Sequence, residues 1–465
     1  MSRPFADDPF LRGNYAPWPM EGEIQDLVVE GEIPREIEGS YFRNGPNPQF
    51  APRGAYHWFD GDGMIHAFRL RDGKASYRNR WVRTARFQLE RAAGEALFGG
   101  LASMGSSDPR VGSSMTSPNA ANTNIVWHAG RLLALWEGGP PHALDPRSLE
   151  TVGPYDFGGK LAGAFTAHPK LDPETGEMLT FGYGFLPPFL RYHVVSKEGR
   201  LVRSEEIEVP VPTMMHDFIV TRDHVIFMVC PAVFRLENIE KGLSPLAWEP
   251  ELGTRIGVMP RAGGSRDVVW FETDPCYVFH PMNAWSDGGR VVADVCRYAR
   301  LPLFDDGKRE EGMQDLSAKL TRWTLDLASG TVKEEALDDA ASEFPRLDER
   351  RSGLRYRHGY AAGASPGGGE RAGFDAIFHY DLDTGTRRMH RVPEGDALGE
   401  AVFVPRAADA PEGDGFLIAL AYRGAERRSD LLILDARNVE DAPLATVQLP
   451  HRIPFGFHGN WAPGV

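Results

Sequence analysis

Short apolar runs, separated by turn residues, dominate the pattern of hydrophobic and polar positions along this chain. Most runs have about four to eight residues rich in Val, Ile, Leu, Phe and Tyr, which is typical of β-strands. Examples are Arg131–Leu135, His224–Val229, Val291–Val295 and Gly415–Ala421. Helical periodicity is rare, and we expect short helices at segments such as Leu89–Met104 and Glu237–Leu243. The pattern therefore predicts an all-β protein.

A weak internal repeat accompanies these strands. An apolar strand runs into an Asp, a polar or Gly-containing turn follows, and a second strand leaves. The repeat occurs at Leu70–Gly73, Leu144–Arg147, Leu171–Gly176, Leu325–Gly330, Leu382–Gly385 and Leu434–Arg437. Hairpins repeated through one long chain are typical of a β-propeller, whereas a sandwich or barrel rarely reaches 465 residues as one domain. We therefore predict a single domain over residues 1–465, with seven blades and long loops on one face.

Composition narrows the classes of function. The chain has 51 Lys+Arg and 65 Asp+Glu, so its formal net charge is −14. A protein that binds nucleic acid normally displays a basic surface, so this balance argues against nucleic acid as a partner. Hydrophobic residues make up 42% of the chain, which is enough for a large core and argues against intrinsic disorder.

Cysteine usage and the absence of targeting signals indicate the compartment. Cys230, Cys276 and Cys296 are too few and too scattered for a disulfide framework, so we expect buried thiols in a reducing compartment. The first residues lack the apolar core of a signal peptide, and no run of about 18 apolar residues is present. We expect a cytoplasmic protein, and the sequence leaves its oligomeric state open. Two apolar runs, Leu97–Leu101 and Phe185–Leu190, are candidates for peripheral membrane contact, with buried loop packing as the alternative.

Four of the 14 histidines share an unusual setting, because each begins or ends an apolar segment. They are His168, His216, His280 and His458. Their separations of 48, 64 and 178 residues exclude a local motif such as His-x-x-x-His. In a propeller the inner strands point toward a common axis, so one histidine from each of four blades can converge on a single ion. From these residues alone, a metal role and ordinary core packing are equally open.

The same segments, together with YFRNGPNP at Tyr41–Pro48 and HWFDGDGMIH at His57–His66, resemble the carotenoid cleavage oxygenase family. That family covers bacterial apocarotenoid oxygenases, plant carotenoid cleavage dioxygenases and lignostilbene dioxygenases. The match extends over nearly the whole chain, with several motifs in order. The resemblance implies a seven-bladed β-propeller with a dome of loops and helices over a non-haem Fe(II) ion. It also implies that the iron ligands are His168, His216, His280 and His458.

Three glutamates match the family's supporting residues, namely Glu137, Glu343 and Glu400. A neutral histidine that binds a metal through one ring nitrogen needs an acceptor for the N–H of the other, which fixes the ring. Three carboxylates can serve three of the four histidines, whereas an isolated Glu would be a solvated residue at the end of a strand. The resemblance also matches Thr123 to a threonine whose methyl group crowds one open position on the metal.

The resemblance, and not the ligand type, selects iron, because neutral imidazoles also suit zinc, copper and nickel. Four histidines leave two octahedral positions open, enough for O2 beside an alkene. We expect an Fe(II) dioxygenase that cleaves a C=C bond of a long apolar substrate into two aldehyde or ketone products. Aromatic candidates for its substrate tunnel, for which core packing is an equal alternative, are Phe59, Trp136, Phe279 and Phe344.

One departure from the family pattern bears on the substrate. Lignostilbene-type members bind the hydroxyl group of a phenol with a Lys just before the position of Glu137 and with a Tyr upstream. This chain has Trp136 there, and residues 93–122 contain no Tyr. We therefore favour an apocarotenoid or carotenoid polyene, with a dioxygenase that cleaves the interphenyl double bond of stilbenes as the alternative. Isomerisation or hydrolysis on the same scaffold, and a metal-free binding module, are further alternatives.

Overall fold

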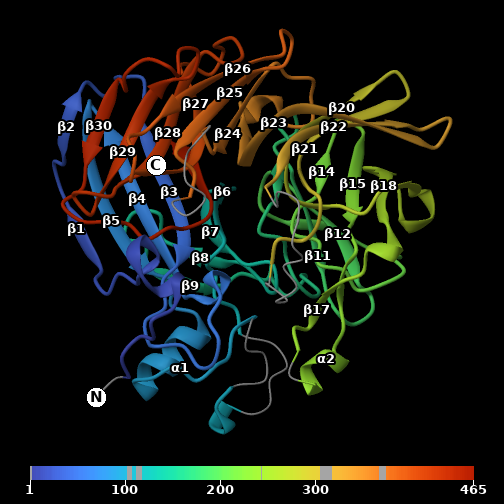
Figure 1. Ribbon diagram of the computed structural model, residues 1–465, viewed down its shortest axis with the longest axis horizontal. Helices are drawn as coiled ribbons and strands as arrows, with labels where there is room; N and C mark the ends of the chain where they lie inside the picture. The colour runs from blue at the N-terminus through green and yellow to red at the C-terminus, as the bar shows by residue number, and fades with distance from the viewer. Residues whose placement is uncertain (1–2, 102–106, 112–117, 242, 304–316, 366–372) are drawn as a thin grey trace. The chain divides into compact units, whose positions relative to one another are not determined.

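The computed structural model describes residues 3–101, 107–111, 118–241, 243–303, 317–365 and 373–465. Over these residues nearly all of the regular secondary structure consists of antiparallel β-strands, so the all-β prediction is confirmed (Figure 1). The chain divides into two compact units. Unit 1 comprises residues 1–161 and 392–465, and unit 2 comprises residues 162–391. A single domain over residues 1–465 stays a prediction.

The described residues of unit 1 form three sheets, with the orders β1-β5-β4-β3-β31, β6-β7-β8-β9 and β2-β30-β29-β28-β27. The strands of the first sheet are β1 (Gly22–Ile24), β3 (Gly39–Pro46), β4 (Gly63–Arg71), β5 (Lys74–Trp81) and β31 (Gly459–Pro463). Those of the second are β6 (Asn124–His128), β7 (Arg131–Leu135), β8 (His142–Leu144) and β9 (Thr151–Pro154). Those of the third are β2 (Val28–Gly31), β27 (Ala397–Pro405), β28 (Gly415–Arg423), β29 (Arg428–Asp435) and β30 (Ala445–Gln448).

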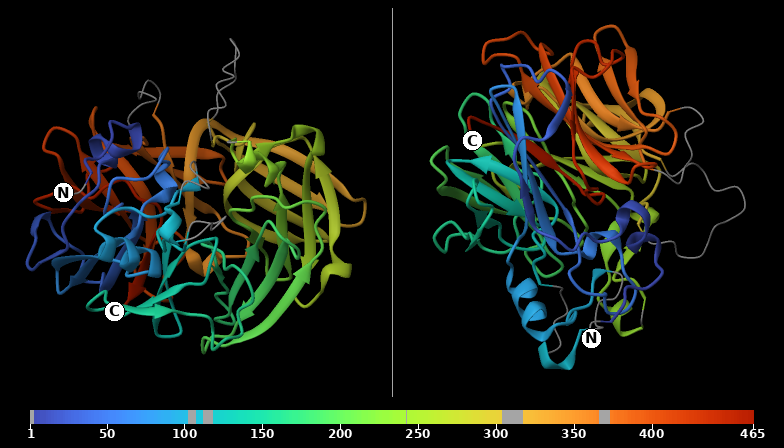
Figure 2. Two further views of the ribbon diagram at one scale, coloured as in Figure 1. Left: turned by 90° about the horizontal axis from the view of Figure 1, so that it is seen from below. Right: turned by 90° about the vertical axis from the view of Figure 1, so that its left-hand side faces the viewer.

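Two sheets of unit 1 join the beginning of the chain to its end. In the first sheet Tyr41 of β3 lies opposite Trp461 of β31, and in the third Val29 of β2 lies opposite Val447 of β30. Blue and red strands therefore run side by side in Figures 1 and 2. Apolar side chains from both sheets, among them Tyr41 and Val447, pack into one buried cluster, so burial holds the two ends of the chain together.

The described residues of unit 2 form four sheets, and a seven-stranded sheet with the order β20-β21-β22-β23-β24-β25-β26 is the largest. Its strands are β20 (Tyr277–Asp287), β21 (Arg290–Tyr298), β22 (Lys319–Asp326), β23 (Thr331–Leu347), β24 (His358–Gly363), β25 (Ala376–Asp381) and β26 (Thr386–Arg391). The order β10-β11-β12-β13 joins β10 (Lys170–Leu171), β11 (Met178–Tyr183), β12 (Leu190–Val195) and β13 (Leu201–Ile207). The remaining strands are β14 (Ile219–Val220), β15 (His224–Val229), β18 (Thr254–Pro260) and β19 (Val269–Thr273) in one sheet and β16 (Ala232–Phe234) and β17 (Leu246–Trp248) in another.

The repeated turn motif lies between paired antiparallel strands at all six of its predicted positions. The turn between β22 and β23 shows why the motif contains Asp and Gly. The carboxylate of Asp326 accepts the N–H groups of Ala328 and Ser329 at 3.1 and 3.0 Å. Gly330 then takes a φ of 70°, which a residue without Cβ adopts at little cost.

The helices are few and short. Helix α1 (Ala85–Ala93) begins after Thr84, whose hydroxyl accepts the N–H of Phe87, and ends at Gly94, which has a φ of 73°. The segment Leu89–Met104, expected to carry a short helix, contains the last five residues of α1, which begins four residues earlier because its N-cap is Thr84; residues 102–104 lie outside the described residues. Helix α2 (Glu237–Glu240) lies within the predicted segment. Short 3-10 helices occur at Pro9–Leu11, Gly13–Tyr15, Trp58–Asp60, Pro109–Val111, Pro250–Leu252, Ser265–Asp267 and Glu349–Arg351.

Candidate metal centre

Three of the four predicted ligands gather in unit 2. His168 lies just before β10, His216 lies three residues before β14, and His280 lies within β20. The Nε2 atom of His216 lies 3.0 Å from Nε2 of His168 and 3.2 Å from Nε2 of His280. All three side chains are buried, and the planes of their rings differ by 58° to 74°. The rings therefore approach one point from different directions.

Hydrogen bonds alone cannot satisfy all three of these nitrogens, whereas a cation among them can. The Nδ1 atom of His280 lies 2.5 Å from Oε2 of Glu343. A carboxylate accepts, so Nδ1 carries the proton and Nε2 of the neutral ring is a bare lone pair. One proton on Nε2 of His216 can bridge to only one of its two neighbours, whereas a metal ion satisfies all three nitrogens at once.

The separations of the nitrogens also indicate a geometry. With a metal–nitrogen bond of about 2.1 Å, ligands at right angles have nitrogens about 3.0 Å apart, and tetrahedral ligands have them about 3.4 Å apart. The observed 3.0 Å matches ligands at right angles, and the observed 3.2 Å lies midway between the two geometries. The three nitrogens therefore lie close enough together to bind one metal ion.

Glu343 is itself held in place by its surroundings. It lies in β23 with 5% of its surface exposed, and its Oε2 also accepts the N–H of Phe344 at 2.6 Å. Tyr298 lies nearby, where burial and then the Glu343 carboxylate hold the pKa of that phenol well above its usual range. The carboxylate is thus fixed on the far side of the His280 ring from the nitrogen cluster.

A further buried carboxylate, Asp217, was missed by the sequence analysis. Its side chain is 2% exposed, and Nζ of Lys170 lies 2.8 and 2.9 Å from its two oxygens. Oδ2 of Asp217 lies 3.8 Å from Nδ1 of His168. Burial raises the pKa of Asp217, and Lys170 opposes that shift. The signal for this pair is its position: Asp217 follows one predicted ligand directly, and Lys170 follows another by two residues.

The fourth predicted ligand, His458, lies in unit 1 with its predicted glutamate. His458 directly precedes β31, and its Nδ1 donates to Oε1 of Glu400 at 3.0 Å. The other oxygen of Glu400 accepts the N–H of Gly459 at 2.8 Å. Nε2, the other ring nitrogen of His458, is therefore the one that can bind a metal ion. The backbone N–H of His458 donates to the carbonyl oxygen of Thr123 at 3.2 Å, so the predicted threonine is a neighbour of this histidine.

Trp136 and Glu137 follow β7 directly in unit 1, and both are half-buried. A Cβ atom on Gly138 would lie 2.7 Å from the indole of Trp136, so the glycine gives that ring its room. The role of Glu137 as a supporting carboxylate stays a prediction.

Aromatic rings flank the histidines of unit 2. The ring of Phe279 meets that of His216 at 5.1 Å with an interplanar angle of 84°. The ring of Phe344 stacks on that of His280 at 5.4 Å and 27°. Both predicted tunnel residues therefore line the cluster of nitrogens. In unit 1, Phe59 meets Phe457 edge-on at 5.4 Å.

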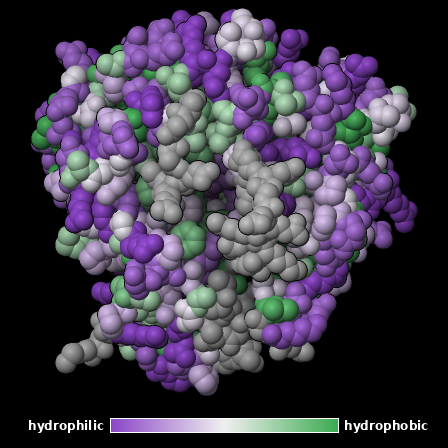
Figure 3. Space-filling model, viewed as in Figure 1, coloured by the Kyte–Doolittle hydropathy of each residue, from purple (hydrophilic) through white to green (hydrophobic). Residues whose placement is uncertain are grey.

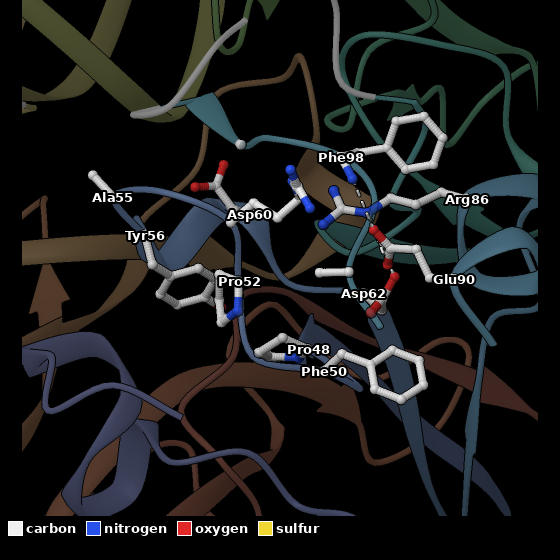
Figure 4. Close-up of a pocket in the computed structure, with 13 residues that line it drawn as sticks. Pro48, Phe50, Pro52, Ala55, Tyr56, Asp60, Asp62, Arg86, Glu90 and Phe98 are labelled. Atoms are coloured by element: carbon white, nitrogen blue, oxygen red, sulfur yellow. Dashed lines mark hydrogen bonds and ion pairs between the residues drawn. The ribbon is translucent and has the colours of Figure 1, made fainter. Parts of the chain in front are cut away.

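The motif His57–His66 supplies two carboxylates to a second buried cluster in unit 1 (Figure 4). Arg86 of α1 lies with its Nε 3.8 Å from Oδ1 of Asp62 and 3.7 Å from Oε2 of Glu90. Burial raises the pKa of Asp62 to about 6, and it also raises that of Asp60. The cavity measures about 10 Å³, which is too small for a substrate. The cluster therefore fixes α1 to the segment between β3 and β4.

The two apolar runs proposed for membrane contact differ. Leu97 and Phe98 are 5% and 6% exposed, so the alternative of buried packing holds for that run, whereas Leu186 is 61% exposed. Figure 3 shows hydrophilic side chains over most of the described part of the face that it displays. Among the described residues, no helix has both the length and the apolar character needed to cross a membrane.

Comparison with known proteins identifies the relatives of the chain. Residues 15–463 match the model of the RPE65 family, described as retinal pigment epithelial membrane protein. A carotenoid cleavage oxygenase of Mycobacterium tuberculosis is 39% identical, with 98% of each chain covered. An isoeugenol monooxygenase of Pseudomonas nitroreducens is 37% identical, with 100% of each chain covered.

Solved structures give the same result. A lignostilbene dioxygenase of Pseudomonas brassicacearum has a TM-score of 0.92 at 35% identity, with both chains covered completely. A glutamate-to-aspartate variant of the Synechocystis apocarotenoid oxygenase has a TM-score of 0.89 at 32% identity, with 99% and 100% covered. A cobalt-substituted form of that enzyme is also among the matches. The chain therefore belongs to the RPE65 family of carotenoid-cleavage-type oxygenases, as its motifs predicted.

Proposed function

We propose that this chain is a non-haem Fe(II) dioxygenase that cleaves a C=C bond of an apocarotenoid or carotenoid polyene with O2. Its products are two aldehydes or ketones. The observation that carries the proposal is the meeting of the Nε2 atoms of His168, His216 and His280 in unit 2. Membership in a family with carotenoid cleavage oxygenases supports the reaction.

In this proposal His458 supplies the fourth ligand. The four predicted ligands are all buried, and each offers a ring nitrogen that can bind a metal ion. Glu343 and Glu400 each accept an Nδ1–H. The Nε2 atoms of His280 and His458 are then the atoms that bind the metal in this proposal. Zinc prefers four tetrahedral ligands, whereas the 3.0 Å separation of the His168 and His216 nitrogens matches ligands at right angles, which suits Fe(II) and supports iron.

Spacing supports Thr123, Trp136 and Glu137 as parts of the same site. Structures of the Synechocystis apocarotenoid oxygenase include substitutions of a threonine, a tryptophan and a glutamate. The tryptophan follows the threonine by 13 residues, and the glutamate comes next. Thr123, Trp136 and Glu137 have the same separations in this chain. We assign Glu137 as the third supporting carboxylate and Thr123 as the residue that crowds an open position.

The sheets support the proposed seven-bladed propeller. Within the described residues, β23 pairs with β22 through its first part and with β24 through its last part. The seven-stranded sheet then counts as two blades of four strands that share β23. With the two four-stranded sheets of unit 2 and the three sheets of unit 1, the blades number seven. The central metal site and the dome of loops and helices belong to the same proposal.

The bound metal supplies the centre at which O2 is activated. The chain's own residues prepare that centre. Glu343 keeps the His280 ring in one tautomer and one orientation. Phe279 and Phe344 give the substrate apolar and aromatic surface, which holds a polyene by dispersion and keeps water out. No charged side chain is needed to anchor such a substrate.

The proposed substrate class rests on Trp136, because an indole has no ammonium group that could form a hydrogen bond with the hydroxyl of a phenol. The alternative is a dioxygenase for the double bond of a stilbene or phenylpropenoid. It is favoured by the names of two relatives, the lignostilbene dioxygenase and the isoeugenol monooxygenase. Within the main proposal the enzyme is cytoplasmic, and the segment around the exposed Leu186 is the part that touches a lipid surface.

The test combines metal analysis with product analysis. Protein loaded anaerobically with Fe(II) should hold about one iron per chain and convert apocarotenals under ¹⁸O2 to labelled aldehydes. Replacement of His168, His216, His280 or His458 by Ala should remove iron and activity together. Conversion of hydroxystilbenes or isoeugenol in preference to every polyene would replace the main proposal by its alternative. A protein that binds no Fe(II) would refute both.

A further inference from the structure

Phe344 has a backbone conformation that is unusual for its residue type. Its φ is 50°, in the left-handed region that bulky side chains rarely adopt. The next residue is Pro345, and a residue before proline is normally restricted to extended conformations. Both effects disfavour the observed conformation. A strained residue of this kind persists when its surroundings fix it, and such residues gather at functional sites.

The strain coincides with a bulge in β23. Glu343 lies opposite Ala362 of β24 and Arg346 lies opposite Tyr360, so β23 has one residue more than its partner between these pairs. The extra residue re-aims the chain directly after Glu343. Phe344 thereby places its N–H 2.6 Å from Oε2 of Glu343 and its ring 5.4 Å from that of His280.

Both contacts act on the same metal ligand. Oε2 of Glu343, which accepts the N–H of Phe344, also accepts Nδ1–H of His280 at 2.5 Å. The N–H fixes the carboxylate that orients the imidazole edge, and the stacked ring fixes the imidazole face. Phe344 therefore acts on the His280 ring at its edge, through Glu343, and at its face, through stacking.

We propose that Phe344 is a positioning residue for His280, and that its strained backbone fixes Glu343 and the ring in the geometry that the metal needs. The proposal rests on the proposed metal site and gives Phe344 a task beyond lining a tunnel. The side chain does this by stacking, and the main chain does it by donating to Glu343. Metal affinity and ligand geometry therefore depend on Phe344 in the absence of any substrate.

The test compares three variants by metal binding in the absence of substrate. Phe344→Leu keeps an apolar side chain but loses the flat ring that stacks on His280. Phe344→Gly loses the ring and also relieves the backbone strain. Phe344→Tyr keeps both the stacked ring and the strained backbone. Phe374→Leu is the matched control, because Phe374 packs edge-on against Phe344 at 6.1 Å. Co(II) affinity is measured by competition with a chelator, and the visible spectrum of bound Co(II) reports ligand geometry.

Phe344→Leu and Phe344→Gly should bind Co(II) about 10-fold more weakly, with a changed spectrum, while Phe344→Tyr and Phe374→Leu match wild type. Phe344→Gly keeps the test valid if the Leu variant fails to fold, since glycine accepts the observed φ. Wild-type affinity and spectrum in Phe344→Gly would overturn the proposal. Absence of Co(II) binding by wild type would instead refute the metal site itself, so the two failures are distinct.

Discussion

The two oxygens of Glu400 have different partners: Oε1 accepts from the ring of His458 and Oε2 accepts from the backbone of Gly459. Both partners are donors. A glutamine has one acceptor oxygen, so it can serve only one of them and must turn its NH2 group toward the other. Glu343 differs, because its two donors share Oε2.

The first prediction follows from this difference. Glu400→Gln should lower the affinity for Fe(II) or Co(II) by about 10- to 100-fold, because one donor loses its acceptor. Glu343→Gln should lower it less, because one amide oxygen can accept from both of its donors. Chelator competition with each purified variant measures the two constants. Equal losses in both variants would contradict the argument.

The second prediction concerns Lys170 and Asp217. Lys170→Met leaves a buried carboxylate without its cation and should lower the free energy of unfolding by about 3 kcal/mol at pH 8. Burial already holds the pKa of Asp217 above its usual value, so the loss should shrink at low pH, where the carboxyl is protonated. Urea unfolding of the metal-free protein measures both values. The double variant with Asp217→Asn should recover most of the loss, and no recovery would exclude the pair as the cause.

The third prediction concerns pH and Asp62. Its pKa is raised to about 6 in the folded protein, so the folded state binds this proton more tightly than the unfolded state. The resulting stability is present below the unfolded pKa and is lost as the pH rises through about 6. Asp62→Asn does not titrate, so its free energy of unfolding should fall by about 1 kcal/mol less than that of wild type between pH 5 and pH 8. Parallel urea titrations at both pH values decide the matter, and identical pH slopes would remove Asp62 as the source.

The fourth prediction concerns substrate choice. Trp136→Lys places an ammonium group where the wild-type enzyme has an indole, so polyene cleavage should fall. A site that hydrogen-bonds a hydroxyl discriminates strongly, whereas an apolar tunnel discriminates weakly. Wild type should therefore accept several apocarotenals of similar length and cleave 4-hydroxystilbenes poorly. The ratio of kcat/KM for the two substrates, measured in both proteins, is the readout. A ratio that the substitution leaves unchanged would place Trp136 outside the substrate path.

Local features of the fold were accessible from the sequence. Arg131–Leu135 and His224–Val229 are β7 and β15 with the predicted bounds, because short apolar runs between turn residues have few other conformations. The short helix expected within Leu89–Met104 begins four residues before that segment, because its cap residue is Thr84.

The candidate site was accessible only in part. Apolar flanks singled out His168, His216 and His280, and the structure brings these three together. The partnership of Lys170 with Asp217 was missed, because a buried ion pair between β10 and the segment before β14 leaves no periodic signal. The positive φ of Phe344 was equally invisible, since a phenylalanine before proline predicts an extended conformation.

The pairing of β3 with β31 has a consequence for the order of assembly. Ser40 and Val465, 425 positions apart, are joined by a hydrogen bond of 2.6 Å, and closing so long a loop costs more entropy than forming a local hairpin. We therefore expect this contact to form after the local hairpins. His458 precedes β31, so it reaches Glu400 only when that strand has docked, whereas the histidines of unit 2 are fixed by nearer segments. Under the proposed function, His458 would therefore be the last of the four predicted ligands to be placed, and metal loading would be completed late in biogenesis.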